Sequence, residues 1–131
     1  TPLDILSRYW GYTAFRECQL DIIESVLAGT DTIGLLPTGG GKSITFQVPA
    51  MLVDGLTLVV TPLISLMKDQ VDNLRSIGIR AGCLHSGMAR PERRLTEDRL
   101  NLGKIKILYI SPEKLAREEF RADLKRWNVR I

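Results

Sequence analysis

The sequence LPTGGGKS, residues 36–43, lies between an apolar run at Thr32–Leu36 and a predicted helix that begins at Lys42. Three consecutive glycines allow a tight turn whose N–H groups point inward, and the helix adds the positive end of its dipole. Lys42 could then reach the β- and γ-phosphates of a nucleotide, and the Ser43 hydroxyl could bind Mg²⁺. We interpret the stretch as a phosphate-binding loop, although Leu36 stands where the usual pattern has its first glycine.

The elements around this loop alternate between strand and helix. Strands are predicted at Thr32–Leu36, Leu56–Val60, 80–84 and 105–110, and helices at 16–28, from Lys42, at 63–77, at 90–102 and, as one or two helices, within 112–127. Leu56–Val60 reads as a strand buried on both faces, and helix 63–77 places Leu63, Leu66, Met67, Val71 and Leu74 on one side. The alternation predicts an α/β fold: a three-layer parallel sheet with helices on both faces and ligands at the carboxyl ends of its strands.

Composition limits the class of protein. With 131 residues, of which 44% are apolar, the chain has room for one packed domain. No apolar run approaches the roughly 20 residues that a membrane span needs, so no membrane partner is expected. Two cysteines, Cys18 and Cys83, make no disulfide framework and are expected to be small buried side chains in a cytoplasmic protein.

Basic residues are concentrated in the middle of the chain. Residues 1–74 carry four basic and eight acidic side chains, whereas residues 75–106 carry eight and three. A basic stretch permits contact with a polyanion, but charge alone favours the alternative explanation, a solvated helix face. The single histidine, His85, has no second ligand at metal-binding spacing, so zinc is not expected.

Residues 9–19, YWGYTAFRECQ, precede the phosphate-binding loop. Tyr12, Arg16 and Gln19 are spaced about one helical turn apart and could converge on a flat base, whose edge a carboxamide can bind with two hydrogen bonds. Spacing alone favours the alternative that these aromatic residues belong to the core.

The motifs GYTAFRECQ, PTGGGKS, VVTPLISLMKDQV and LYISPEKL occur in one order from about Tyr9 to Trp127. In this respect the chain resembles the RecQ family of superfamily 2 DNA helicases. The resemblance implies a single, truncated RecA-like P-loop domain, with an adenine-recognition segment at 1–30 and a core at 31–131 that lacks the Walker B strand. It implies ATP and Mg²⁺ as cofactors, Lys42 and Ser43 as catalytic residues, and Ser43 as the metal ligand. The implied ATP-binding residues are Tyr12, Arg16, Gln19, Pro37, Thr38, Gly39, Gly40, Gly41, Lys42 and Ser43.

Two loops that follow predicted strands are candidates for DNA binding. Taken alone, their Ser and Thr residues are better explained as helix caps. In the resembled family, however, they correspond to motifs Ia and Ib, which contact single-stranded DNA. The implied DNA-binding residues are Thr61, Pro62, Leu63, Ser65, Lys68, Gln70, Ser111, Pro112 and Glu113.

The resemblance also implies a 3′ to 5′ DNA helicase of recombination and repair, whose second RecA-like domain completes the ATP site and whose partners are single-stranded and duplex DNA. The acid that positions water would follow Ile131, so this chain alone is expected to bind nucleotide weakly and hydrolyse almost none. Two alternatives remain open: another P-loop enzyme such as a small-molecule kinase, and a non-catalytic nucleic-acid-binding module.

Overall fold

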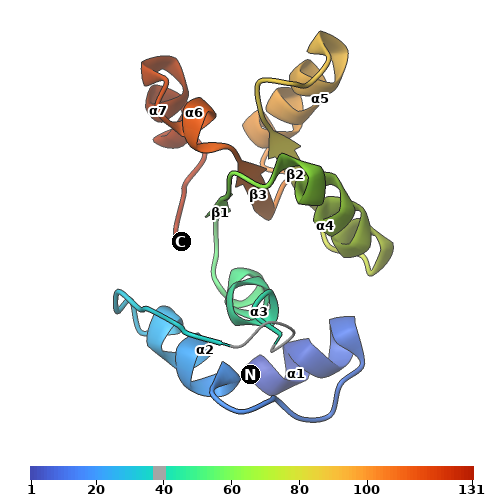
Figure 1. Cartoon of the computed structure of the whole chain (residues 1–131), viewed down its shortest axis with the longest axis vertical. Helices are drawn as coiled ribbons and strands as arrows, with labels where there is room; N and C mark the ends of the chain where they lie inside the picture. Colours follow the sequence, from blue (N-terminus) through green and yellow to red (C-terminus); the bar gives the residue numbers. More distant parts are fainter. Residues whose placement is uncertain (37–40) are drawn as a thin grey trace. The chain divides into compact units, whose positions relative to one another are not determined.

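The computed structural model describes residues 1–36 and 41–131, which form two compact units, Thr1–Asp54 and Gly55–Ile131 (Figure 1). Pro37, Thr38, Gly39 and Gly40, four of the predicted ATP-binding residues, lie outside the described residues. In the described part of the chain, no helix is long and apolar enough to cross a membrane.

The second unit contains a parallel sheet of three strands, β1 (Thr57–Val60), β2 (Ala81–Leu84) and β3 (Ile107–Ile110), in the order β1-β3-β2. Helix α4 (Ile64–Ser76) connects β1 to β2, and α5 (Arg90–Asn101) connects β2 to β3. Val60 and Leu84 both pair with Ile110, so the three strands end at the same edge. The predicted α/β class and these three strands are confirmed.

Helices cover both faces of this sheet. Leu84, Leu108 and Ile110 share a core cluster with Leu100 of α5 and with Phe120 of α7 (Glu118–Leu124). Because side chains alternate along a strand, Ile107 and Tyr109 of β3 face the other way, and both are buried. Helix α4 contacts β2 and buries its own apolar stripe. Figure 1 shows α4 and α5 leaving the sheet in different directions.

Two details of the predicted packing are wrong. Leu63 and Leu66 are 55% and 46% exposed, because α4 begins only at Ile64 and Leu66 lies about 100° around the helix from Met67. Strand β1 is not buried on both faces: Val60 is 47% exposed. On the side away from β3, residues 128–131 run beside β1: Leu56 and Val129 form a parallel bridge, and Leu58 N donates to Ile131 O at 2.9 Å.

The first unit is helical in its described residues. It comprises α1 (Pro2–Ile5), the π-helix η1 (Leu6–Trp10), α2 (Gln19–Leu27) and α3 (Ile44–Leu52). Leu6, Ile23 and Val48 form its buried cluster, which joins η1, α2 and α3. The predicted helices at 16–28 and from Lys42 therefore exist with later starts, whereas α1 and η1 lie outside every predicted range.

The predicted strand at Thr32–Leu36 is wrong, since these residues form neither strand nor helix. Ile33 is 90% and Leu35 is 89% exposed. A strand needs a neighbour that satisfies its N–H and C=O groups, and none of the three described strands pairs with this segment. The apolar pattern was therefore insufficient without a partner.

Both cysteines are free, and neither is buried as expected. Cys18 is exposed and lies, with a φ of 69°, in a left-handed turn immediately before α2. Cys83 is half-buried in β2. Burial raises the pKa of the Cys83 thiol, and the Arg75 charge offsets part of this rise.

The C-terminal region forms two short helices, α6 (Pro112–Leu115) and α7, as predicted for 112–127. Trp127 follows them and is 8% exposed within the core cluster, where its ring meets Phe120 edge-on at a centroid distance of 5.5 Å. This tryptophan therefore packs in the core and offers no open face for stacking.

Candidate functional site

Gln19 connects the segment before α2 to the end of the glycine-rich loop. Its side chain is buried, with 4% exposed. Gln19 Oε1 accepts a hydrogen bond from Arg16 N at 2.7 Å, and Gln19 Nε2 donates one to Gly41 O at 3.0 Å. The carboxamide therefore fixes two backbone groups that are distant in sequence, because Gly41 lies 22 residues after Gln19.

Gly41 is required at its position for two reasons. Its φ of 77° is in the left-handed region, where a residue with a side chain is strained. A Cβ built on Gly41 would also overlap Gln19 Nε2, and it would lie 3.8 Å from Arg16 Cδ. The backbone at Gly41 can thus approach the Gln19 amide only without a side chain.

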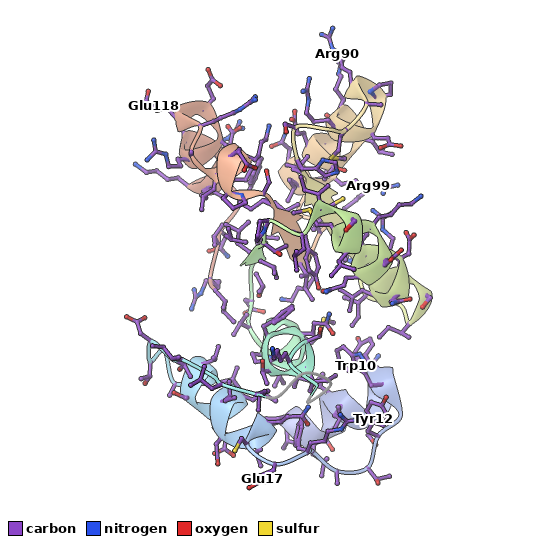
Figure 2. The ribbon with its side chains drawn as sticks, viewed as in Figure 1. Trp10, Tyr12, Glu17, Arg90, Arg99 and Glu118 are labelled. Carbon is purple, nitrogen blue, oxygen red and sulfur yellow. The ribbon has the colours of Figure 1, made fainter. Side chains whose placement is uncertain are left out.

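Tyr12 and Arg16 lie in the loop that precedes α2, not on a helix, so helical spacing does not describe their arrangement. Tyr12 is 58% exposed, as Figure 2 shows at the surface of the loop, and Arg16 is also an exposed residue. Arg16 and Gln19 are brought together with Gly41, as the hydrogen bonds above show.

Lys42 and Ser43 lie at the amino end of α3. Lys42 is exposed, and Ser43 is the N-cap residue of the helix. The Ser43 side chain makes no capping hydrogen bond, although its backbone oxygen accepts one from Gln47 N at 2.9 Å. An uncommitted hydroxyl, an exposed ammonium group and the positive end of a helix dipole together suit Mg²⁺ and phosphate. Within residues 1–36 and 41–131, no group of three or more His, Cys, Asp and Glu side chains could hold a metal ion.

Thr61 and Ser111 follow β1 and β3 and meet at the carboxyl edge of the sheet, where Thr61 N donates to Ile110 O at 3.0 Å. Both hydroxyls make local bonds: Thr61 Oγ1 accepts from Leu63 N, and Ser111 Oγ accepts from Lys114 N as the cap of α6. Ser111 is fully buried. Any ligand at this edge would therefore meet the exposed neighbours of these residues, namely Pro62, Leu63, Ser65, Lys68, Pro112 and Glu113.

Gln70 differs from the other predicted DNA-binding residues. It lies in the middle of α4 and is only partly exposed. Its Oε1 atom is shielded from solvent and has no hydrogen-bond partner among the described residues. The predicted DNA contact through Gln70 would require its side chain to turn outward.

The family of the chain follows from comparison with known sequences. Residues 16–130 match the family model described as DEAD/DEAH box helicase. The chain belongs to this family. Within the DEAD/DEAH box helicases it is similar to "ATP-dependent DNA helicase RecQ" of Synechocystis, with 51% identity over 115 residues, and to the protein of that name from Pasteurella multocida, with 45% identity over 120 residues. It is also 48% identical over 111 residues to "Probable ATP-dependent DNA helicase RecS" of Bacillus subtilis. The resemblance to RecQ helicases is thereby confirmed.

These alignments cover most of this helicase chain but a small part of its relatives. They include 88%, 92% and 84% of the chain, and 24%, 19% and 22% of the three relatives, respectively. The chain therefore spans about a quarter or less of the length of the curated relatives it matches.

A solved structure shares the fold of this DEAD/DEAH box helicase chain. It is the crystal structure of a hypothetical ATP-dependent RNA helicase from Sulfolobus tokodaii, with a TM-score of 0.67 and 22% identity. The match covers 96% of this chain and 38% of that one. It confirms the predicted RecA-like α/β fold.

Sequence reasoning identified Gln19 and Gly41 separately but not the bond between them. Nothing in the spacing of two residues 22 positions apart indicates a contact. The one available signal is the third glycine of the loop, Gly41, which marks a position where another group approaches the backbone closely.

Proposed function

We propose that this chain supplies the ATP-binding part and a strand-binding edge of an ATP-dependent DNA helicase that moves 3′ to 5′. The observation that carries the proposal is the Gln19 carboxamide, which joins the backbone of Arg16 to that of Gly41. A base held by Tyr12 and Arg16 would thereby be linked to the loop that holds the phosphates. The names of the curated relatives support the same activity.

In this proposal, each residue of the site has a separate task. Tyr12 and Arg16 stack on adenine, and Gln19, which is buried between Arg16 N and Gly41 O, would have to turn toward the base to bind its edge. Lys42 neutralises the β- and γ-phosphates, and the amide groups at the amino end of α3 add partial positive charge. The Ser43 hydroxyl would hold Mg²⁺, which, when bound, balances the charge that develops on the phosphates. Pro37, Thr38, Gly39 and Gly40 would complete the phosphate-binding loop.

Binding of single-stranded DNA is assigned to the carboxyl edge of the sheet. The exposed residues around Thr61 and Ser111 would contact the phosphate backbone, which carries no base sequence, so binding would tolerate any sequence. A second RecA-like domain would close over the nucleotide and convert hydrolysis into movement, in the setting of DNA recombination and repair. The Gln19 hydrogen bonds favour a helicase over a small-molecule kinase, because they connect the segment proposed to bind adenine to the glycine-rich loop.

Nucleotide binding by this chain is the first test. We expect MgATP to bind more tightly than MgGTP in a calorimetric titration, because the Gln19 carboxamide, once turned toward the base, matches the edge of adenine. Lys42→Ala should weaken MgATP binding about tenfold or more, since it removes the cation closest to the phosphates. Lys125→Ala, at the exposed end of α7, is the matched control and should leave binding unchanged.

ATP hydrolysis and duplex unwinding are measured on the whole protein that the gene encodes. ATP hydrolysis should rise when single-stranded DNA is added and should disappear with Lys42→Ala. A duplex with a 3′ single-stranded tail should be unwound in preference to one with a 5′ tail. Hydrolysis that ignores DNA would favour another P-loop enzyme, and DNA binding that ignores both ATP and Lys42→Ala would favour a non-catalytic binding module.

A further inference from the structure

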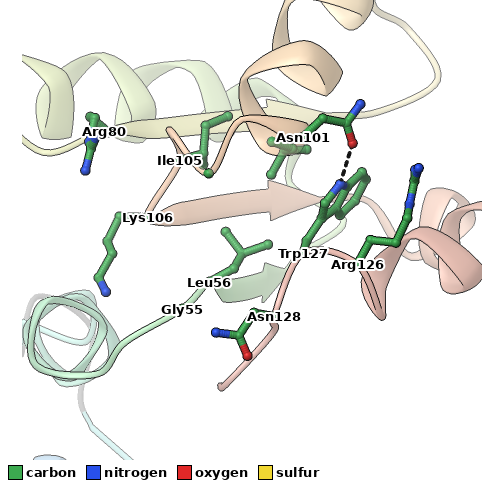
Figure 3. A pocket seen from close by; sticks show the side chains of 11 residues that line it. Gly55, Leu56, Arg80, Asn101, Ile105, Lys106, Arg126, Trp127 and Asn128 are labelled. Carbon is green, nitrogen blue, oxygen red and sulfur yellow. Dashed lines mark hydrogen bonds between the residues drawn. The ribbon is translucent and has the colours of Figure 1, made fainter.

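The amino edge of the sheet, opposite the edge that carries Thr61 and Ser111, holds two adjoining pockets. One of about 340 Å³ is lined in part by Arg80, Lys106 and Arg126 (Figure 3). The other, of about 370 Å³, is lined in part by Arg75, Arg80, Arg99 and Lys104. Arg80 and Ile105 line both, so the two pockets form one continuous surface, which we call the amino-edge pockets.

Positive charge in the amino-edge pockets is not balanced locally. No Asp or Glu side chain lines either pocket. Arg126 pairs with Asp123 at 2.5 Å, but Arg75, Arg80, Arg99 and Lys104 form no ion pair with any described residue. A concave surface with several cations and no carboxylate attracts anions, and the attraction weakens as salt is added.

Hydrogen bonds hold these cations in place. Arg80 O accepts from Lys106 N at 2.8 Å and from Ile107 N at 3.3 Å, which ties the residue before β2 to the start of β3. Arg75 Nε donates to Ala81 O at 2.9 Å. Arg80 and Lys106 therefore stand directly before β2 and β3, and Arg75 is tied to β2, so these three cations are anchored to the sheet. Anchored groups lose little freedom when they bind a ligand.

The scarcity of exposed aromatic rings in the amino-edge pockets indicates which kind of anion fits. Trp127 Nε1 donates to Asn101 Oδ1 at 2.9 Å, and the ring is 8% exposed, so Trp127 is a wall of the pocket (Figure 3). No other aromatic residue lines either pocket. Proteins that bind single strands commonly stack bases on exposed aromatic rings, and this surface has none. A surface that offers cations but no exposed aromatic ring suits the phosphate groups of the backbone better than unstacked bases.

We propose that the amino-edge pockets bind the phosphate backbone of duplex DNA. Two pockets that share Arg80 can accept neighbouring phosphates, whereas a single free phosphate would use only one of them. The site is separate from the ATP site and from the predicted strand-binding edge, so it does not depend on the proposed function. It would give the molecule a second, sequence-independent contact with nucleic acid.

The test compares two double variants of the full chain that change charge equally. Arg80→Gln with Lys104→Gln alters the amino-edge pockets; both side chains are exposed and take part in no hydrogen bond or ion pair among the described residues, so folding should be preserved. Arg121→Gln with Lys125→Gln, on and next to α7, is the control with the same change of charge; it removes one exposed hydrogen bond, from Arg121 to Ala116 O at 3.4 Å. Circular dichroism should give the same spectrum for both.

Fluorescence anisotropy with a labelled duplex of mixed sequence gives the readout. The Arg80/Lys104 double variant should bind about tenfold more weakly, and the slope of log K against log salt should fall by about two, at roughly 0.9 per lost phosphate contact. The Arg121/Lys125 variant should match the unmodified chain. Equal losses in both variants, or no loss in the first, would overturn the proposal.

Two further arms separate the sources of phosphate. Inorganic phosphate is titrated while the amide signals of Gly78 and Gly103, which lie beside the pockets, are followed by NMR. The proposal expects these signals to move with duplex DNA at concentrations where inorganic phosphate has no effect. Saturation by inorganic phosphate without a response to duplex would identify a small-anion site instead. Tighter binding of single-stranded DNA than of duplex, lost in the Arg80/Lys104 variant, would also overturn the assignment.

Discussion

The contact between Gln19 and Gly41 is the smallest unit on which the proposed nucleotide site depends. Gly29 offers a close comparison, because its φ of 79° nearly equals the 77° of Gly41, yet a Cβ at Gly29 would meet nothing within 4 Å. Gly29→Ala should therefore cost only the strain of a left-handed residue, about 1 kcal/mol of unfolding free energy. Gly41→Ala should cost about 1–3 kcal/mol more, because it also displaces the Gln19 amide from its hydrogen bond. Urea denaturation measures both.

A double-mutant cycle isolates this contact. In a Gln19→Ala background the overlapping Nε2 atom is gone, so Gly41→Ala should cost no more than Gly29→Ala does. An undiminished cost in that background would contradict the steric explanation. The bond itself could not be predicted from the sequence, because it depends on how α2 and the glycine loop approach each other in space.

At the scale of elements, periodicity predicted β2, β3, α4 and α5 well, since each has neighbours in the second unit that satisfy its pattern. Thr32–Leu36 shows that an apolar pattern alone does not make a strand. Its apolar residues match a strand, but no described strand pairs with it, and Ile33 and Leu35 remain exposed. Leu66 fails for a related reason: an apolar residue beside a helix stripe need not belong to it. The sequence pattern of an element indicates which of its side chains could be buried. Whether they are buried depends on the helices and strands that pack against it.

This difference predicts opposite outcomes for two leucines. Leu35→Ser should change the free energy of unfolding by no more than about 0.5 kcal/mol, since the side chain is 89% exposed. Leu74→Ala, on the buried stripe of α4, should cost about 2–5 kcal/mol, because the side chain is 2% exposed and its loss leaves a cavity. Chemical denaturation of the two variants provides the measurement. A large loss with Leu35→Ser would show that residues 31–36 are packed in solution.

At the scale of the whole molecule, the chain combines two units of different construction. The second unit contains all three described strands and the core cluster around Leu108, Ile110 and Phe120. The first depends on a smaller cluster, Leu6, Ile23 and Val48, among short helices. Both the alternation of elements and the glycine motif pointed to one continuous α/β fold, and neither contained a signal for a boundary at Asp54 and Gly55. Such a boundary depends on which residues meet across the whole chain, which local patterns do not report.

The construction predicts that the second unit folds alone. A chain of residues 55–131 should unfold in one cooperative thermal transition, because its sheet and its main apolar cluster need no residue of the first unit. Residues 1–54 should show a weak or non-cooperative transition, since so small a chain buries little apolar surface. Circular dichroism at 222 nm measures both. A second unit that lost its cooperative transition would show that the two units are energetically dependent, and the stabilities of the Gly41 and Leu74 variants would then have to be interpreted as properties of one cooperative whole.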